Sequence, residues 1–263
     1  LLFDKLEIER INDILEKKYF YNARKRYKKS FIKSKALIYL SDYSKKVINR
    51  DLGIKKNNKV IAHGLDSIFR IPANRTYQLK HKIEILYVSP IFHYKHHLEV
   101  VKAVNILKSQ TNLNVYLNFV GGGKSSATAE LKSWIHEKKL NELVRFTQYV
   151  NTESLVDAYK SADIFIFASS CETFGITLLE AMGAKLPIAC SNKTGLPAIL
   201  KDAGVYFNPE NPESIVNALK RLIENEALRR ALGEKAHELS KEYTWENCAT
   251  ETYNFIKSLS PKN

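Results

Sequence analysis

Short apolar runs alternate with helix-like segments through most of the chain, and this alternation limits the fold more than any other feature. The runs are rich in β-branched and aromatic residues, as is typical of buried parallel strands. They occur at 83–88, 115–120, 144–146, 163–168, 187–189 and 205–207. Segments with helical periodicity follow at 97–107, 128–138, 152–161, 176–182 and 195–201. Because crossovers of this length are right-handed, the pattern predicts an α/β fold with a Rossmann-like, doubly wound parallel sheet.

Further elements are expected at both ends of this core. Residues 1–31 are predicted to form one or two helices, followed by a short strand at 36–40. Ser41 is then a suitable N-cap for a helix from Asp42 to Arg50. The last helix is expected to begin after an N-cap, with Trp245 as a core residue. The helices expected after the sheet lie at 212–225, 226–242 and 245–259.

The stretch from Ser169 to Met182 joins an expected strand to an expected helix through a polar loop. Open α/β sheets bind ligands at the carboxyl ends of their strands, where unpaired amides and the positive end of a helix dipole attract anions. A phosphate is therefore the expected ligand. Glu172 and Glu180 flank the helix start, and carboxylates accept hydrogen bonds from sugar hydroxyls. By themselves, two glutamates at this spacing are more typical of a solvated loop and a helix surface.

The run Glu172-Thr-Phe-Gly-Ile-Thr-Leu-Leu-Glu180-Ala-Met resembles the signature of retaining GT-B glycosyltransferases of the family-4 type. That signature is a glutamate, seven residues and a second glutamate, with Phe-Gly after the first and Glu-Ala-Met or similar at the second. The resemblance implies metal-independent transfer from a nucleoside diphosphate sugar with the anomeric configuration kept. It implies that Glu172 contacts the donor sugar and that Glu180 binds the ribose. The backbone expected to contact the sugar and diphosphate is that of Phe174, Gly175, Ile176 and Thr177.

Three further loops are expected at the same edge of the sheet. In the first, Lys95 matches the family's phosphate-binding lysine and can neutralise a diphosphate as a point charge, although Pro90 stands where many members carry an arginine. In the second, Gly121 lies in a loop similar to the family's Val-Gly-x-Gly and would let the donor approach the backbone. In the third, the main chain around Tyr149 and Val150 resembles the strand end that reads the nucleobase. Lys95 is thereby expected to share the catalytic role with the first signature glutamate.

The resemblance also implies a division of the chain. Residues 1–59 are expected to be the C-terminal part of a basic, acceptor-side domain whose larger part precedes this sequence. Residues 60–82 are expected to form a hinge, in which His63 occupies the usual place of an asparagine. Residues 83–242 are expected to form the nucleotide-sugar-binding, Rossmann-like domain. Residues 243–263 are expected to form a helix that packs back towards the N-terminal domain.

The net charge of +13 is concentrated at the start of the chain. Residues 1–60 hold 17 lysines and arginines against 7 acidic residues. Within 17–35 the basic residues alternate with tyrosine and phenylalanine, which predicts a helical basic and aromatic face. A solvated face and contact with an anionic membrane surface are equally favoured. Nucleic acid ranks behind both and is not expected as a partner, because no arginine-rich reading motif accompanies the face.

Other patterns indicate location and exclude some chemistry. No apolar run approaches the roughly 18 residues of a membrane span, and no secretory leader opens the chain. Cys171, Cys190 and Cys248 show no Cys-x-x-Cys spacing and fit a reducing compartment. A cytoplasmic protein is predicted, peripheral at the inner face of the membrane if the basic face binds lipid. Cys171 is interpreted as loop filler because no base accompanies it.

Two other site chemistries are disfavoured. The cluster of His93, His96 and His97 invites a metal, but a loop histidine and two adjacent helical ones would point in different directions. We therefore predict no metal and no cofactor beyond the donor substrate. The triple glycine from Gly121 lacks the spacing of a nucleotide triphosphatase loop.

Three functions stay open at this point. A glycosyltransferase of polysaccharide or glycolipid biosynthesis, with a saccharide or lipid-linked acceptor, agrees with the whole signature. A nucleotide-sugar epimerase of GT-B shape would share the fold, although the intact Phe-Gly and Glu-Ala-Met context favours transfer. A nucleotide-sugar-binding module without activity of its own is the third. The sequence leaves the donor sugar, the base, the acceptor and the linkage open.

Overall fold

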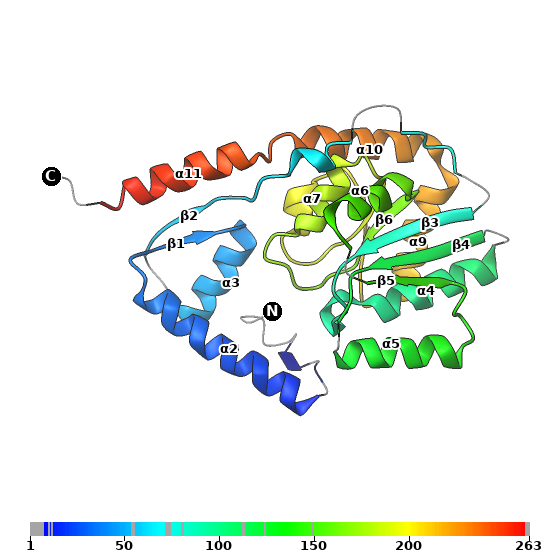
Figure 1. Ribbon diagram of the computed structural model, residues 1–263, viewed down its shortest axis with the longest axis horizontal. Coiled ribbons are helices and arrows are strands. Elements are labelled where there is room, and N and C mark those ends of the chain that lie inside the picture. The colour runs from blue at the N-terminus through cyan, green and yellow to red at the C-terminus, as the bar shows by residue number, and fades with distance from the viewer. Residues whose placement is uncertain are drawn as a thin grey trace.

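The computed structural model contains two parallel sheets with helices packed around them (Figure 1). It describes residues 8–9, 11, 13–53, 56–71, 75–79, 82–111, 114–123, 125–148 and 150–260. The larger sheet has six strands in the order β5-β4-β3-β6-β7-β8, and the smaller pairs β1 with β2. Every strand pair in both sheets is parallel. The predicted α/β fold with a doubly wound parallel sheet is confirmed.

The predicted strands and crossover helices of the large sheet are all present, with ends shifted by a few residues. The strands are β3 (Lys82–Val88), β4 (Asn114–Val120), β5 (Val144–Thr147), β6 (Ile164–Phe167), β7 (Ile188–Ser191) and β8 (Val205–Phe207). The helices are α4 (His97–Gln110), α5 (Ser126–Glu137), α6 (Thr152–Ser161), α7 (Ile176–Gly183), α8 (Leu196–Leu200), α9 (Pro212–Glu224) and α10 (Glu226–Ser240).

Burial explains why the strands read as continuous apolar runs. All four residues of β6, Ile-Phe-Ile-Phe, are buried, as are all four of β7, because helices cover both faces of the sheet. Burying each isoleucine or phenylalanine side chain of β6 contributes roughly 1.5–3 kcal/mol. The helix starts are set by side-chain caps: Ser125 accepts from the amide of Thr128, and Asn151 accepts from that of Ser154.

The strand order creates a topological switch point at β3. The chain runs outward from β3 through β4 to β5, then returns to β6, which pairs with the other side of β3. It then runs outward again through β7 to β8. The loops that follow β3 and β6 therefore meet at the carboxyl edge of the sheet, which is the usual ligand position in such folds.

The N-terminal part consists of α2 (Ile14–Lys33), β1 (Ala36–Tyr39), α3 (Asp42–Leu52) and β2 (Asn57–Val60). Helix α2 extends beyond the predicted end at residue 31, and residues 1–7 lie outside the described part of the chain. Strand β2 was missed because its polar Asn-Asn-Lys sequence has no strand pattern; it forms by pairing with β1. Its line continues where the amide of Ile61 donates to the Tyr39 carbonyl at 2.8 Å.

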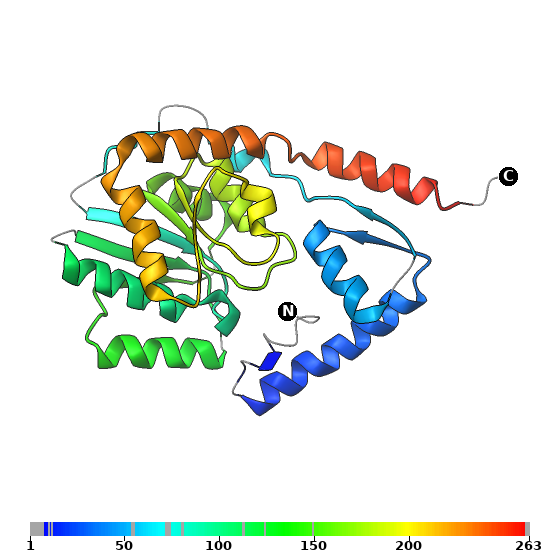
Figure 2. The same cartoon turned by 180° about the vertical axis from the view of Figure 1, so that it is seen from behind.

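The last helix, α11 (Trp245–Lys257), runs away from the large sheet and alongside β2 (Figures 1 and 2). Lys59 of β2 pairs with Glu251 of α11 at 3.2 Å. The prediction of Trp245 as a core residue is wrong: the side chain is 50% exposed, and no residue of α11 is buried. The helix projects beyond the sheet (Figure 1) and leaves the ring half exposed, although the His63 ring lies 5.5 Å away between centroids. The predicted N-cap is present, since Thr244 accepts from the amide of Asn247.

No helix in the described part of the chain combines the length and the apolar character needed to cross a membrane.

Candidate functional site

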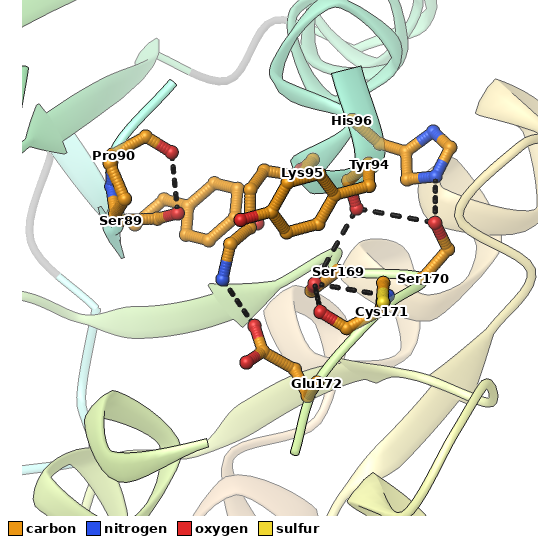
Figure 3. A network of polar contacts seen from close by, with 10 residues as sticks. Ser89, Pro90, Tyr94, Lys95, His96, Ser169, Ser170, Cys171 and Glu172 are labelled. Atoms are coloured by element: carbon orange, nitrogen blue, oxygen red, sulfur yellow. Dashed lines mark hydrogen bonds and ion pairs between the residues drawn. The ribbon is translucent and has the colours of Figure 1, made fainter. Parts of the chain in front are cut away.

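The two loops at the switch point each contribute one of the predicted catalytic residues. Lys95 ends the short 3-10 helix η2 (His93–Lys95) after β3, and Glu172 lies in the loop after β6. The ammonium of Lys95 and the carboxylate of Glu172 form an ion pair (Figure 3). The side chains are only 9% and 14% exposed. The fold thus joins two residues that lie 77 positions apart in the sequence.

Two aromatic rings lie close to the cation of this largely buried ion pair. The ammonium nitrogen of Lys95 lies 5.3 Å from the ring centroid of Tyr94 and 5.4 Å from that of Phe167. Separating two charges in such a site leaves each without compensation, which is costly. An anionic ligand that binds Lys95 therefore has to compete with the carboxylate of Glu172.

Hydrogen bonds fix the two loops to each other (Figure 3). The carbonyl of Tyr94 accepts from the Ser170 amide at 2.8 Å, the Ser170 hydroxyl at 3.2 Å and the Ser169 hydroxyl at 3.4 Å. The carbonyl of Lys95 accepts from the hydroxyl of Tyr87 at 2.7 Å. Burial raises the pKa of Tyr87 well above its usual value, so this hydroxyl stays protonated as a donor. The backbone that carries Lys95 is therefore held in place on both sides.

Gly175 opens helix α7 in a conformation that favours glycine. Its φ is +103°, and an added Cβ would lie 3.0 Å from Leu196. The first-turn amides of a helix have no acceptor within that helix, so those of Ile176 and Thr177 are suited to a ligand. Phe174 is 3% exposed, with its ring 5.5 Å from that of His63, so any ligand contact by this residue is left to its backbone.

Glu180 lies one turn further into α7 and is buried, so the alternative of a surface glutamate is wrong. Its exposure is 9%, and the hydroxyl of Tyr159 on α6 donates to its Oε2 at 2.7 Å. Burial raises the pKa of Glu180 to about 7, although the hydrogen bond from Tyr159 acts in the opposite direction. The carboxyl group can therefore exchange a proton near neutral pH.

Gly121 allows a close approach of two loops. It has φ +119°, and an added Cβ would lie 2.5 Å from the carbonyl oxygen of Ser89. Next to it is a cavity of about 320 Å³, whose lining includes Lys132 and Gln148, neither of which the sequence singled out. Val150 is half-buried against the core, and Tyr149 lies outside the described residues. The predicted roles of these residues in donor binding stay predictions.

The three histidines near η2 point to different partners. His93 lies 2.9 Å from the hydroxyl of Ser126, and His96 lies 2.8 Å from that of Ser170. His97 is stacked on Tyr87, and burial, followed by the charges of Lys95 and His96, lowers the pKa of His97 to about 3. His96 and His97 are 6% and 2% exposed, so neither is a solvated histidine.

Metal ligation also finds no support around these rings. Among the residues that the structure describes, no group of three or more His, Cys, Asp or Glu side chains could hold a metal ion. The predicted independence of a metal stays a prediction.

A contact between α2 and α5 was not expected. The carboxylate of Glu16 on α2 accepts from the hydroxyl of Ser126 at 3.1 Å and lies 3.4 Å from its amide, at the N-terminus of α5. A carboxylate is favourable there because of the helix dipole. The residues are 110 positions apart, and no local pattern links them. The contact places the start of α2 next to the loop that follows β4, as both views show (Figures 1 and 2).

The outer surface of α2 is basic and aromatic, as predicted. Lys25, Arg26 and Lys29 line a shallow cavity of about 490 Å³ together with Tyr19 and Asn22. Tyr19 is 63% exposed. No acidic residue occurs between positions 17 and 35. The surface therefore attracts anions over the length of the helix.

Comparisons with known proteins agree on one family. The model of the family described as Glycosyl transferases group 1 matches residues 73–239. O-antigen chain mannosyltransferase B of Escherichia coli is 27% identical over 234 residues, which cover 86% of this chain and 61% of that protein. A D-inositol 3-phosphate glycosyltransferase of Corynebacterium urealyticum is 26% identical over 168 residues, which cover 62% of this chain and 40% of that protein. The chain thus spans less than two thirds of the length of these two relatives.

A solved structure agrees in fold. Anabaena Alr3699/HepE, in complex with UDP and glucose, matches with a TM-score of 0.80 at 16% identity, over 95% of this chain and 70% of that chain. At this identity the likeness concerns the fold alone. It confirms the predicted α/β fold of GT-B type.

Proposed function

The chain belongs to the glycosyl transferases group 1 family, and we propose that the protein moves a sugar from a nucleoside diphosphate sugar to an acceptor hydroxyl. The ion pair of Lys95 and Glu172 at the switch point carries this proposal. A cation suited to a diphosphate and a carboxylate suited to sugar hydroxyls lie together where open α/β sheets bind their ligands. We further propose that the anomeric configuration is kept and that no metal ion takes part.

Lys95 and the start of α7 would stabilise the departing diphosphate. During transfer the bond between the anomeric carbon and the phosphate oxygen breaks, and negative charge grows on the diphosphate. The ammonium of Lys95 and the first-turn amides at Ile176 and Thr177 supply positive charge at that place. Fixed donors of this kind can do the work of a divalent cation, which supports transfer without a metal.

Glu172 would orient the donor sugar once the diphosphate has replaced Glu172 as the partner of Lys95. The carboxylate is then released from its ion pair and is free to accept from sugar hydroxyls. Glu180, held by Tyr159, would accept from the ribose hydroxyls. The backbone near Gly121, Tyr149 and Val150 would lie along the nucleoside.

The acceptor would be a saccharide or a lipid-linked saccharide. The relative from Escherichia coli is a mannosyltransferase of the O-antigen chain, which favours a role in polysaccharide or glycolipid biosynthesis. We assign residues 1–59 to the acceptor side, 60–82 to the hinge, 83–242 to donor binding and 243–263 to a helix that returns towards the acceptor side. The contact between Lys59 and Glu251 supports the last assignment.

An anionic membrane surface is the partner we propose for residues 17–35, which would make the protein peripheral at the cytoplasmic face. Exposed cations alternate with exposed aromatic and apolar groups along α2: Tyr19, Tyr27 and Ile32 are 63%, 51% and 49% exposed, and Lys25, Arg26 and Lys29 are exposed between them. Cations on such a helix are attracted to acidic lipid headgroups, while the apolar groups enter the interface. The absence of acidic residues from 17 to 35 adds to the charge complementarity.

Calorimetry with UDP, GDP and ADP and their sugars, with and without EDTA, tests the donor site. We expect one nucleoside diphosphate to bind equally well in both conditions. Glu180→Ala should weaken it at least tenfold, while Glu153→Ala, at an exposed position on α6, should not. Binding that EDTA abolishes would contradict metal independence, and equal binding by Glu180→Ala would contradict the assigned site.

Product analysis separates transfer from the two alternatives. With acceptor present, a transferase gives a new glycoside that retains the donor's anomeric configuration. An epimerase of GT-B shape would instead change the donor sugar without any acceptor. A binding module would bind the donor and yield no product in either case.

A further inference from the structure

His96 joins η2 to α4 with a backbone conformation that residues other than glycine rarely adopt. Its φ and ψ are 52° and 35°, in the left-handed region. It is the N-cap residue of α4, yet its side chain makes no capping hydrogen bond. Glycine would meet the same backbone requirement with less strain. The imidazole therefore has to be explained by what the ring itself contacts.

The ring connects α4 to the loop after β6. Its Nε2 lies 2.8 Å from the hydroxyl of Ser170, and its Nδ1 lies 3.5 Å from the carboxylate of Glu99 (Figure 3 shows the first contact). Burial acts to raise the pKa of Glu99, but the hydrogen bond from His96 and further backbone and charge interactions lower it below its usual value. Glu99 is therefore a carboxylate, and it lies on the Nδ1 side of the His96 ring while Ser170 lies on the Nε2 side.

This connection lies beside both charged residues of the site. His96 directly follows Lys95, and Ser170 precedes Glu172 by two positions. The bond between His96 and Ser170 therefore spans the same two loops as the ion pair, a short distance along each chain. Without it, the loop after β6 would hold the chain on the N-terminal side of Lys95 through the Tyr94 carbonyl, but the start of α4 on the other side would be less restrained. The ammonium of Lys95 would then be positioned less exactly.

We propose that His96 is a positioning residue for sugar transfer, which holds Lys95 at the place where charge develops on the departing diphosphate. This inference rests on the proposed function. It predicts an effect on the rate rather than on ground-state binding, because a small displacement of a cation matters most where charge is growing. Ser170 has the same positioning role, since the imidazole of His96 contacts the loop after β6 through the Ser170 hydroxyl.

His96→Gly tests the proposal because it keeps the left-handed backbone and removes the ring. We expect kcat to fall at least tenfold while the dissociation constant of the nucleoside diphosphate stays within about threefold. Ser170→Ala should have a similar effect, and the double variant should be no slower than the slower single variant. Free imidazole should restore part of the rate of His96→Gly but not that of Ser170→Ala. Lys139→Gly, an exposed left-handed position after α5, is the matched control and should leave kcat unchanged.

The outcomes separate this proposal from the function on which it rests. A kcat of His96→Gly equal to that of wild type would overturn the positioning role. So would a double variant in which the free-energy effects of the two single losses of kcat simply add. Neither result would contradict the proposed function of sugar transfer. If the unsubstituted protein transfers no sugar, the proposed function fails first. A crystal structure of His96→Gly then decides the geometric claim: displacement of Lys95 from Glu172 supports it, and an unchanged ion pair overturns it.

Discussion

The hydroxyl of Tyr159 donates a 2.7 Å hydrogen bond to the carboxylate of Glu180 between α6 and α7. Both side chains are buried, and Tyr159 is fully so. A single hydrogen bond offsets only part of the cost of removing a carboxylate from water, and the pKa of Glu180 is accordingly raised from 4.5 to about 7. The same residue is predicted to bind the donor ribose, so folding stability and ligand binding are both linked to its proton.

Glu180→Gln should stabilise the unliganded protein at neutral and alkaline pH. In the folded state the carboxyl keeps its proton up to about pH 7, whereas in the unfolded chain it ionises near 4.5. The free energy of unfolding that this pKa difference contributes is therefore fully present below pH 4.5 and is lost as the pH rises from there to about 7. At about 1.4 kcal/mol per pKa unit, this contribution is roughly 3 kcal/mol. Urea unfolding should show the variant more stable by up to that amount at pH 8 and equal to wild type at pH 4.5.

The matched control is Glu153→Gln, because Glu153 is exposed on the neighbouring helix. It should give no gain in stability at pH 8. An equal gain from both substitutions would show that the effect reflects net charge rather than the buried site.

Nucleoside diphosphate affinity should rise with pH up to about 7 and then level off. Ribose hydroxyls that donate to Glu180 favour its ionised form, so binding below pH 7 requires loss of the proton. The affinity should fall by up to about tenfold for each unit below the pKa of about 7. Calorimetry in buffers of different ionisation enthalpy should detect proton release. Glu180→Gln is the control, because the nucleotide's own phosphate titrates in the same way with either protein. The same pH profile for wild type and Glu180→Gln would refute the link between affinity and the proton of Glu180.

Glu172→Gln and Lys95→Met should have opposite effects on the binding of a nucleoside diphosphate. Removing the carboxylate frees the ammonium of Lys95 from its partner, so we expect unchanged or up to about tenfold tighter binding together with a loss of sugar transfer. Removing the cation should weaken binding by at least about tenfold. Titration calorimetry measures both, with Lys108→Met on the exposed end of α4 as the control. Weaker binding by Glu172→Gln would mean that the carboxylate does not compete with the diphosphate.

Gly121→Ala should destabilise the protein and disturb the site. Its φ of +119° strains any other residue, and the new Cβ would lie 2.5 Å from the carbonyl oxygen of Ser89. We expect a loss of about 1–3 kcal/mol in the free energy of unfolding and weaker nucleotide binding. Gly53→Ala is the matched control: φ is +62° there, and nothing lies within 4 Å of the added Cβ. Equal losses in both variants would show that the approach to Ser89 is unimportant.

The sheet was predictable from sequence because burial on both faces leaves a local signal. β6 shows it most clearly, with Ile-Phe-Ile-Phe followed at once by a polar loop. The strand order was not predicted, since no periodicity states which strand is the neighbour of β3. Strand β2 was missed for a related reason: its Asn-Asn-Lys sequence is extended only because β1 supplies a partner.

In the site, too, local sequence patterns predicted the residues but not the contacts between distant segments. Lys95 and Glu172 were found singly, because each lies in a recognisable motif. Their ion pair follows from the strand order and could not be read from either motif. Burial of Glu180 against Tyr159, and the contact of Glu16 with α5, likewise depend on packing between distant segments.

Charge reversal on α2 should abolish binding to acidic membranes. The triple variant Lys25→Glu, Arg26→Glu and Lys29→Glu changes three exposed cations that lie on one face of the helix. Each basic residue near an anionic surface contributes about 1 kcal/mol to binding. The affinity for vesicles containing phosphatidylserine, measured by sedimentation, should therefore fall about 100-fold or more. Wild-type binding should itself fall as salt is raised, because screening shortens the reach of these charges.

The control reverses Lys138, Lys139 and Lys160, which are also exposed but lie on or after α5 and α6. It changes the net charge equally, so it should leave vesicle binding nearly intact if the surface of α2 is the docking site. Nucleoside diphosphate binding should be unchanged in both triple variants, because none of these residues lies at the ion pair of Lys95 and Glu172. Wild-type sedimentation that depends on neither acidic lipid nor salt would mean that the basic face of α2 is only solvated.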